Sequence, residues 1–166
     1  NESLESIKQN DFNNLKNVAF LEEANNRFTT SCRRFLNKKG YKDPKKIGPL
    51  YYIIEEIENI ADQYKYLCNY LYNLRNKKIK ISKEVLELYQ ATNELLKNFY
   101  ELYYKFEKEK LVHIGKQRKI LVDRFLNLFE KNFSNTDKLI QYHLFTIMQK
   151  IFCLVGPYLV INHDLN

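Results

Sequence analysis

The sequence predicts an all-α protein, an elongated antiparallel helical bundle. With 4 Gly and 3 Pro among 166 residues, the chain has few turn formers for a β-sandwich or barrel. Hydrophobic residues make up 45% of it, which is enough to bury a sizeable core. Along several long stretches the apolar residues recur at steps of three and four, the spacing of amphipathic helices. Long helices joined by short connectors form bundles of this kind.

The first predicted helix extends from about residue 11 to 36, and Asp11 is its candidate N-cap. Residues 1–8 before it look like the tail of a preceding element. The apolar positions of the helix fall on roughly one side: Leu15, Val18, Ala19, Leu21, Phe28 and Phe35. The helix should end before residues 37–49, because the Gly and Pro residues there disfavour a helix interior.

The second predicted helix covers about residues 50–74 and carries an apolar stripe that we centre on Ile57. Its members alternate in steps of three and four: Leu50, Ile53, Ile54, Ile57, Ala61, Tyr64, Cys68 and Leu71. The helix leads into a basic connector at residues 75–80.

A third helical pattern begins near Ser82 and persists to about residue 132, which is too long for one ordinary helix. We expect a bend or break near residues 110–116, where Gly115 lies. The fourth helix should begin at the cap candidates 134–136 and run to about Tyr158.

The segment 144–161 within the fourth helix is strongly apolar, but Gln149, Lys150 and the Gly156-Pro157 pair interrupt it. We therefore predict a buried bundle helix here rather than a membrane span.

A weak internal similarity suggests two repeated units. The segments "EEANNRF" (22–28) and "KILVDRF" (119–125) both end in Asn or Asp, then Arg and Phe. Each precedes a connector and then a helix rich in Ile, Leu and Tyr, so a tandem repeat is consistent with the pattern.

The net charge of +7 lies almost entirely in the first half of the chain. Residues 33–46 hold seven Lys or Arg against one Asp, and this loop is either a solvated connector or a docking surface for an acidic partner or DNA. Three lone cysteines, Cys32, Cys68 and Cys153, form no C-x-x-C pair, which favours a reducing cytoplasm over a disulfide framework. We predict a buried structural role for Cys153.

The sequence contains no recognisable catalytic pattern, and we expect no catalysis. His113, His143 and His163 lack the mutual spacing of metal ligands, and we assign them to the surface and to helix ends. No glycine-rich phosphate loop, nucleophile elbow or zinc-protease pattern occurs.

One pair of carboxylates stands out on the second helix. Glu58 and Asp62 lie four residues apart, where two like charges cost an isolated helix a few tenths of a kcal/mol. Glu55 and Asn69 project to the same flank of the helix. Either this is a wet face on which Asp62 pairs with Lys65, or it is a row of oxygen ligands for a cation.

The segment "IENIAD", with Glu58-x-x-x-Asp62, resembles the E-x-x-x-D signature of the PhoU family of phosphate-uptake regulators. Its aliphatic and aromatic context, "LYYIIEEIENIADQYKYLCNYL", is similar to that of the family. The upstream "KQNDFNNLKNVAFLEEANNRF" resembles the preceding family helix, with Glu22 and Asn26 at its acidic or amide positions. The connector after it looks closest to archaeal members.

This resemblance implies two tandem three-helix bundles. Residues 1–80 would form a first half that lacks most of its first helix. Residues 81–166 would form the second, with helices at about 82–104, 111–132 and 136–158. The second signature would be Gln149-x-x-x-Cys153, a poor set for a hard cation. An iron or zinc site is therefore expected only in the first half, on the following residues: Glu58, Asp62, Glu22 and Asn26.

The resemblance also implies a non-catalytic regulator of phosphate uptake that works by protein contact. Expected partners are a phosphate ABC transporter or a signalling protein, with a homodimer as the assembly and no small-molecule substrate. The location would be cytoplasmic, peripheral at the membrane through the transporter. Because the chain starts at Asn1 without Met, we expect it to be part of a longer protein. Some archaeal members of the family carry an upstream DNA-binding domain of swapped-hairpin type, so the resemblance implies such a domain as a candidate for the preceding part.

Two other classes remain open. The alternative is a nucleic-acid-associated helical module, or a domain of a transcriptional regulator, whose binding would weaken steeply with salt. A ferritin-like di-metal bundle is disfavoured, because it would need Glu-x-x-His on inward faces of two helices and no such pair occurs.

Overall fold

The computed structural model describes residues 1–162, and these residues form helices and no strand. The predicted all-α helical bundle is confirmed. In chain order the elements are α1 (Glu2–Lys8), α2 (Leu15–Lys39), the 3₁₀ turn η1 (Pro44–Lys46), α3 (Ile47–Asn73), α4 (Lys83–Tyr104), α5 (Lys108–Phe129), α6 (Asn135–Cys153) and α7 (Val155–Asn162).

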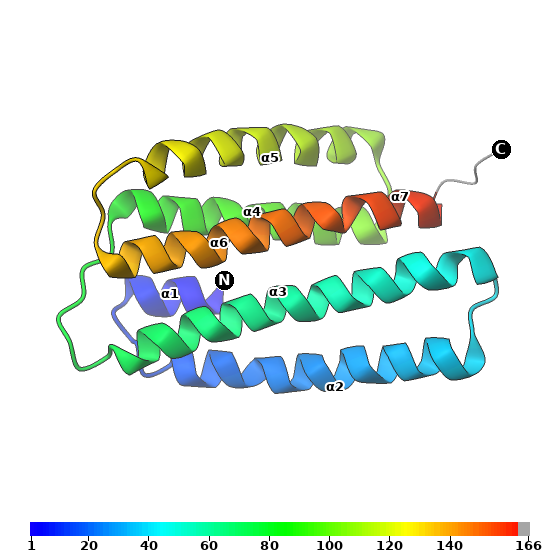
Figure 1. The fold of residues 1–166 in the computed structure, drawn as a ribbon, viewed down its shortest axis with the longest axis horizontal. Helices are drawn as coiled ribbons and strands as arrows, with labels where there is room; N and C mark the ends of the chain where they lie inside the picture. The colour runs from blue at the N-terminus through cyan, green and yellow to red at the C-terminus, as the bar shows by residue number, and fades with distance from the viewer. Residues whose placement is uncertain (163–166) are drawn as a thin grey trace.

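The helix α3 lies at the centre of the packing (Figure 1). It packs along its length against α2 on one side and against α6 and α7 on another. The helix α4 covers α6, and α5 packs more extensively on α4 than on α6. The short helix α1 lies between α2 and α4. The resulting molecule is an elongated bundle of long helices.

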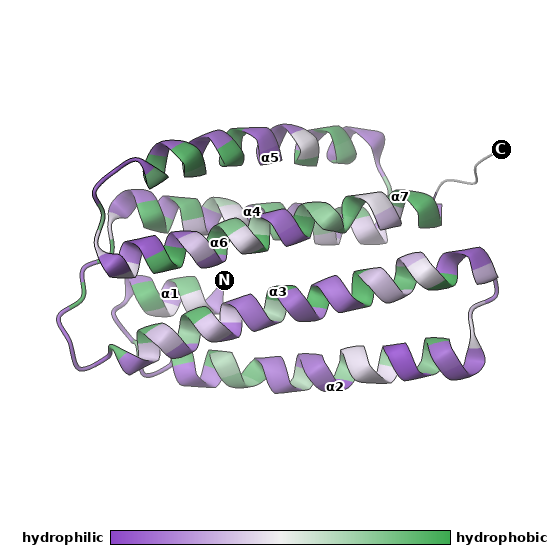
Figure 2. Ribbon diagram, in the orientation of Figure 1, coloured by the Kyte–Doolittle hydropathy of each residue, from purple (hydrophilic) through white to green (hydrophobic). Residues whose placement is uncertain are grey.

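The core forms around α6, which packs against α3 on one side and α4 on another. On α3 the residues Ile53, Ile60 and Leu67 recur every seven positions and are buried. This is the repeat that keeps one face of a helix against its neighbours. On α6 the buried apolar positions are Ile140, Leu144, Ile147, Met148 and Ile151. Figure 2 shows the matching alternation of hydrophobic and hydrophilic residues along these helices.

The prediction that Ile57 lies at the centre of the buried stripe of α3 is wrong. Ile57 is 40% exposed, whereas Ile60, one turn further on, is 4% exposed. The core face of α3 is centred on Ile60 and Leu67, and Ile57 lies at its edge. Glu56 is buried instead, and its Oε2 accepts a hydrogen bond from Lys150 Nζ of α6 at 3.4 Å.

The predicted break near residues 110–116 is also wrong. Gly115 lies within α5, and the chain turns at residues 105–107, where Lys105 and Glu107 have extended backbones. An added Cβ at Gly115 would meet no atom within 4 Å, so nothing there requires glycine. The position of the turn agrees with the α4 end near residue 104 that the PhoU resemblance implied.

Two predicted helix starts differ from the observed ones. Asp11 does not cap α2, because its Oδ1 accepts a hydrogen bond from the Asn14 backbone N–H in the turn before the helix. The helix α3 begins at Ile47, so Gly48 and Pro49 lie in its first turn. Proline is tolerated there because the first N–H groups of a helix have no intrahelical acceptor.

The fourth predicted helix is divided at Leu154 into α6 and α7, with Pro157 in the first turn of α7. By length and composition, 135–162 is the one stretch of the described chain that could cross a membrane. The core helix of a bundle meets the same criterion, and α6 packs within the fold against α3, α4 and α5.

The helix starts of α4 and α6 are joined through Asp137, which is buried. Its Oδ1 accepts from the Ser82 backbone N–H at 3.0 Å, and its Oδ2 accepts from the hydroxyls of Ser82 at 2.8 Å and Ser134 at 2.9 Å. Ser134 in turn accepts from the Asp137 backbone N–H, as an N-cap does. Both predicted cap residues therefore stand at their helix starts.

The structure corrects two expectations about isolated polar residues. His143 is buried in the middle of α6, and its Nδ1 lies 2.9 Å from Gln63 Oε1 of α3. His113 is exposed as expected, and His163 lies outside the described residues. Cys153 is exposed rather than buried, whereas burial raises the pKa of the Cys68 thiol to about 12.

The two isoleucines of α3 give a matched test of the packing. Ile60→Ala should lower the free energy of unfolding by about 2–5 kcal/mol, because it leaves a cavity in a close-packed core. Ile57→Ala should cost about 1 kcal/mol or less, since part of that side chain already meets water. Urea unfolding of both variants measures this, and equal costs would contradict the observed register of α3.

The buried imidazole of His143 predicts a pH dependence. Desolvation lowers its pKa below the ordinary 6.5, so below that pH the unfolded chain binds a proton that the folded chain does not. Stability should therefore fall as the pH drops below about 6.5, by at most about 1.4 kcal/mol per pH unit from this group. Unfolding of His143→Gln should depend less on pH between about 7.5 and 5.5, and an unchanged dependence would refute this assignment.

Candidate functional site

The Glu58 and Asp62 side chains lie where α3 faces α2, and they belong to a polar seam between these helices. On α2 the seam residues follow helical steps of three and four, and so do those on α3. We define the polar seam by eight residues: Glu22, Asn26, Thr29 and Arg33 of α2, with Glu55, Glu58, Asp62 and Lys65 of α3.

At one end of the seam, Arg33 joins two carboxylates. Its Nη1 lies 2.5 Å from Glu55 Oε2, and its Nη2 lies 2.6 Å from Glu58 Oε2. Thr29 Oγ1 also donates to Glu58 Oε2, at 2.8 Å. The hydrogen bond to Glu55 and the nearby Glu58 charge raise the pKa of the guanidinium, which stays charged. Glu58 Oε2 is thus held by two residues of α2.

At the other end, Lys65 joins the remaining carboxylates. Its Nζ lies 2.6 Å from Asp62 Oδ1 and 3.1 Å from Glu22 Oε1 across the helix pair. Desolvation by burial lowers the pKa of Lys65, but the hydrogen bonds to Asp62 and Glu22 outweigh it and raise the pKa overall. The ammonium therefore bridges α2 and α3, and it neutralises a carboxylate that is itself buried.

The structure brings three of the four predicted site residues, Glu58, Asp62 and Glu22, onto these two cations. The fourth, Asn26, has a buried Oδ1 with no hydrogen-bond partner among the described residues. Asn69, predicted on the same flank, is exposed and takes no part. The local repulsion between Glu58 and Asp62 is offset because each carboxylate binds its own cation.

The arrangement does not fit the iron or zinc that the PhoU resemblance implied. The donor oxygens are divided between Arg33 and Lys65, and a metal would have to displace a bound cation. Among residues 1–162, no group of three His, Cys, Asp or Glu side chains is placed to hold a metal ion. On α6 the corresponding Gln149 and Cys153 offer an amide and an exposed thiol. The metal site remains a prediction that these contacts do not support.

Arg33 and Thr29 were missed in the sequence as members of the site. The signal in the sequence was their helical spacing, because Thr29 and Arg33 follow Asn26 at successive steps of three and four. This spacing places them on the same face of α2 as Asn26. Arg33 was counted instead within the basic loop 33–46, where its neighbours are exposed.

Searches for a matching family model, a similar curated protein and a similar solved structure found no match for this chain.

Removing the ammonium of Lys65 tests the seam energetically. Lys65→Met should destabilise the fold by about 1–2 kcal/mol, because Glu22 and Asp62 lose their shared cation. Lys83→Met is the matched control, since Lys83 is exposed and its nearest carboxylate, on Glu87, is 3.8 Å away. Its cost should be within about 0.5 kcal/mol. Similar costs for the two variants in urea unfolding would show that Lys65 is an ordinary surface lysine.

Metal binding gives an independent test of the same contacts. Because two side-chain cations occupy the carboxylates, the purified protein should carry no stoichiometric iron or zinc, and a chelator should leave its Tm unchanged. Elemental analysis of the wild type and of the Glu58→Gln/Asp62→Asn variant measures this. Stoichiometric metal in the wild type that is lost in the variant would contradict the fit described above.

Proposed function

We propose that this protein is a non-catalytic, PhoU-type regulator of phosphate uptake that acts through protein–protein contact. The observation that carries the proposal is the polar seam. Glu58 of α3 binds Thr29 and Arg33 of α2, and Lys65 joins Asp62 to Glu22, one of the two α2 positions that the resemblance singled out. The proposed family relationship accounts for carboxylates at these positions on both helices.

The order of the helices also supports the proposal. The hairpin of α2 and α3 and the group of α4, α5 and α6 meet where α3 packs against α6. The helices α3 and α6 are the third helices of the two proposed halves, residues 1–80 and 81–166. The Asn/Asp-Arg-Phe tripeptide that ends the segments 22–28 and 119–125 does not support a tandem repeat. Its phenylalanines lie in different environments, because Phe28 is exposed and Phe125 is fully buried. The proposal depends on helix order and the seam instead.

The proposed partners are a phosphate ABC transporter or a signalling protein, and a second copy of the chain as a homodimer. Such contacts would place the protein in the cytoplasm, at the membrane surface when it binds the transporter. The polar seam then serves to fix α2 on α3, so that the outer faces of this hairpin keep one shape for recognition. An upstream DNA-binding domain would connect the contact to transcription.

A second candidate, a nucleic-acid-associated module, is favoured by one observation. The segment 33–46, predicted as a loop, comprises the last turns of α2, a short connector and η1. It presents a concentration of Lys and Arg, and its lysines are largely exposed. A mobility shift that weakens steeply with added salt would support this candidate, and no shift at low salt would remove it.

The phosphate proposal predicts a change in uptake. Deleting the gene in its source organism should alter the rate of radiolabelled phosphate uptake when phosphate is abundant. Re-expression of the wild type should restore the rate, and Lys65→Met should restore it less well than Lys83→Met. Identical uptake with and without the gene, at both high and low phosphate, would overturn the proposal.

A further inference from the structure

Arg118, in the middle of α5, is a partly buried arginine with no polar partner among residues 1–162. Its guanidinium carbon lies over the Phe152 ring of α6, 4.0 Å from the ring centroid. Its Nε is buried and has no hydrogen-bond acceptor. The two other partly buried arginines, Arg33 and Arg124, both form ion pairs with glutamates. A stacked guanidinium whose N–H groups lack acceptors is arranged to bind a carboxylate from outside the described chain.

Arg118 begins a line of side chains along the junction of α5 and α6, which we name the α5–α6 strip. Its members on α5 are Arg118 and Phe129, which are eleven residues apart, or about three helical turns. Its members on α6 recur at steps of four, three and seven: Lys138, Tyr142, Phe145 and Phe152. The two lines meet at both ends, because Arg118 stacks on Phe152 and the Phe129 and Phe145 ring centroids are 5.7 Å apart.

The middle of the α5–α6 strip is aromatic and accessible. Tyr142 is 59% exposed and Phe129 is 45% exposed, while Phe145 and Phe152 are partly buried between the helices. Tyrosine and arginine are the side chains that most often dominate the energy of protein–protein contacts. The composition of the strip is therefore that of a contact surface for another protein.

The two cations of the strip lie at its opposite ends. Lys138 is exposed and pairs with no carboxylate within residues 1–162. It precedes Phe152, the ring beneath Arg118, by 14 residues, which is about 21 Å along a helix. A bound segment with carboxylates at both ends and apolar side chains between them would complement this order of charges.

Carboxylates of the protein itself leave these cations free. Asp137 is the one carboxylate of α6, and it is buried and bound to Ser82 and Ser134. On α5, Asp123 is exposed but lies about 140° round the helix from Arg118. The strip therefore offers positive charge without an acidic side chain of its own.

The chemistry of Arg118 favours a carboxylate over a phosphate group as its ligand. The planar guanidinium matches a carboxylate in a bidentate contact, and one positive charge balances one negative charge. A phosphate group carries up to two negative charges and would call for a second cation. The nearby α6 lysine, Lys150, is already bound to Glu56 of α3.

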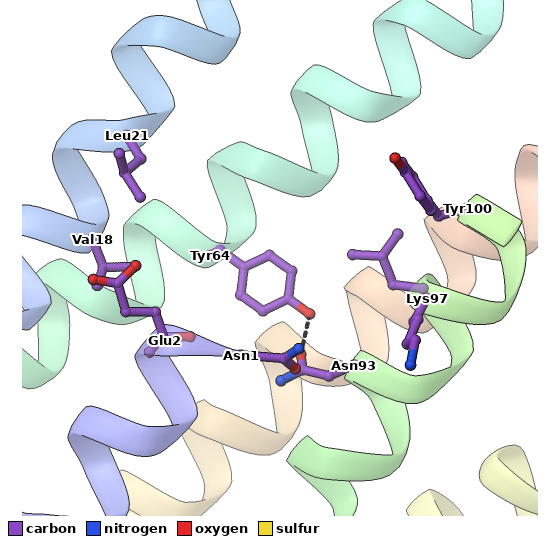
Figure 3. A pocket seen from close by; sticks show the side chains of 10 residues that line it. Asn1, Glu2, Val18, Leu21, Tyr64, Asn93, Lys97 and Tyr100 are labelled. Atoms are coloured by element: carbon purple, nitrogen blue, oxygen red, sulfur yellow. Dashed lines mark hydrogen bonds between the residues drawn. The ribbon is translucent and has the colours of Figure 1, made fainter.

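The strip is separate from the surface beside Asn1. Asn1 lines a pocket of about 520 Å³ with residues of α1 to α4, and Figure 3 shows it next to Tyr64 and Asn93. The helix α1 packs on α2 and α4, whereas α5 packs on α4 and α6. A continuation of α1 before Asn1 would enter this pocket and not the strip.

We infer that the α5–α6 strip binds an amphipathic α-helix of a partner protein through its carboxylates and an apolar stripe. One carboxylate binds Arg118, a second faces Lys138, and the apolar stripe packs on Phe129 and Tyr142, since a shallow junction of two helices accepts a third. The inference goes beyond the proposed function, which places recognition on the hairpin of α2 and α3. It does not depend on a link to phosphate.

A synthetic helix tests the inference with the purified chain. The probe is a fluorescent helical peptide of ~18 residues with an apolar stripe and one Glu at each end of that stripe. Its control has Gln in place of both Glu. Fluorescence anisotropy should show saturable binding of the acidic peptide and at least about tenfold weaker binding of the Gln control.

Matched variants assign the binding to the strip. Arg118→Gln and Tyr142→Ala should each weaken binding at least about tenfold. Arg34→Gln, at an exposed arginine of α2, and Tyr66→Ala, at a tyrosine of α3 that is 49% exposed, should bind as the wild type does. Because Tyr142 is largely exposed, its variant keeps the test valid even if Arg118→Gln lowers stability.

Three outcomes would overturn the inference: no saturable binding of the acidic peptide, equal binding of the Gln control, or equal binding by both strip variants. The full gene product should bind the peptide equally well. Loss of binding there would show that another part of the same polypeptide covers the strip, and would refute a partner protein. A wild-type dimer that Arg118→Gln dissociates in sedimentation would instead make the strip an interface between copies. The uptake measurement is separate, so failure of the strip and failure of the phosphate proposal can be told apart.

Discussion

The packing of α3 against several neighbours at once is the constraint on which the fold depends. Its Ile53, Ile60 and Leu67 are buried in the core that α6 and α7 help to form, while the polar seam holds α2 on another side. Burying carboxylates there would cost free energy if they were unpaired, and Arg33 and Lys65 remove that cost. The position of α2 therefore depends on charge pairing as well as on apolar contact.

Because charge pairs hold the inner face of α2 on α3, the apolar residues of α2 lie partly on its outer surface. The inner face of α2 carries the seam, so much of its apolar content lies elsewhere, in Leu21, Phe28 and Phe35. These side chains are exposed on the outer surface of the hairpin of α2 and α3. In the proposed regulator, a rigid hairpin presents this surface to a protein partner, and binding would then lose little conformational entropy.

Sequence reasoning identified the fold class and the approximate extent of the long helices, because helical periodicity and turn residues are local signals. Of its two alternatives for the Glu58–Asp62 flank, the one that pairs Asp62 with Lys65 is the one observed. It failed at Ile57, since a stripe on one helix does not say whether another element covers it. It also placed the α4–α5 turn at Gly115, because a lone glycine resembles a break, whereas the extended Lys105 and Glu107 carry no such signal. The role of Arg33 depends on contacts between helices, which no single helix reveals.

The central claim is that Glu58 and Asp62 of α3 bind side-chain cations that hold α2 in place. A double-mutant cycle on Arg33→Met and Glu58→Gln, measured by urea unfolding, tests it most directly. The account predicts a coupling free energy of about 1 kcal/mol, because each single variant removes the same contact. Costs that add within about 0.3 kcal/mol would show that the two side chains act independently and would contradict the claim.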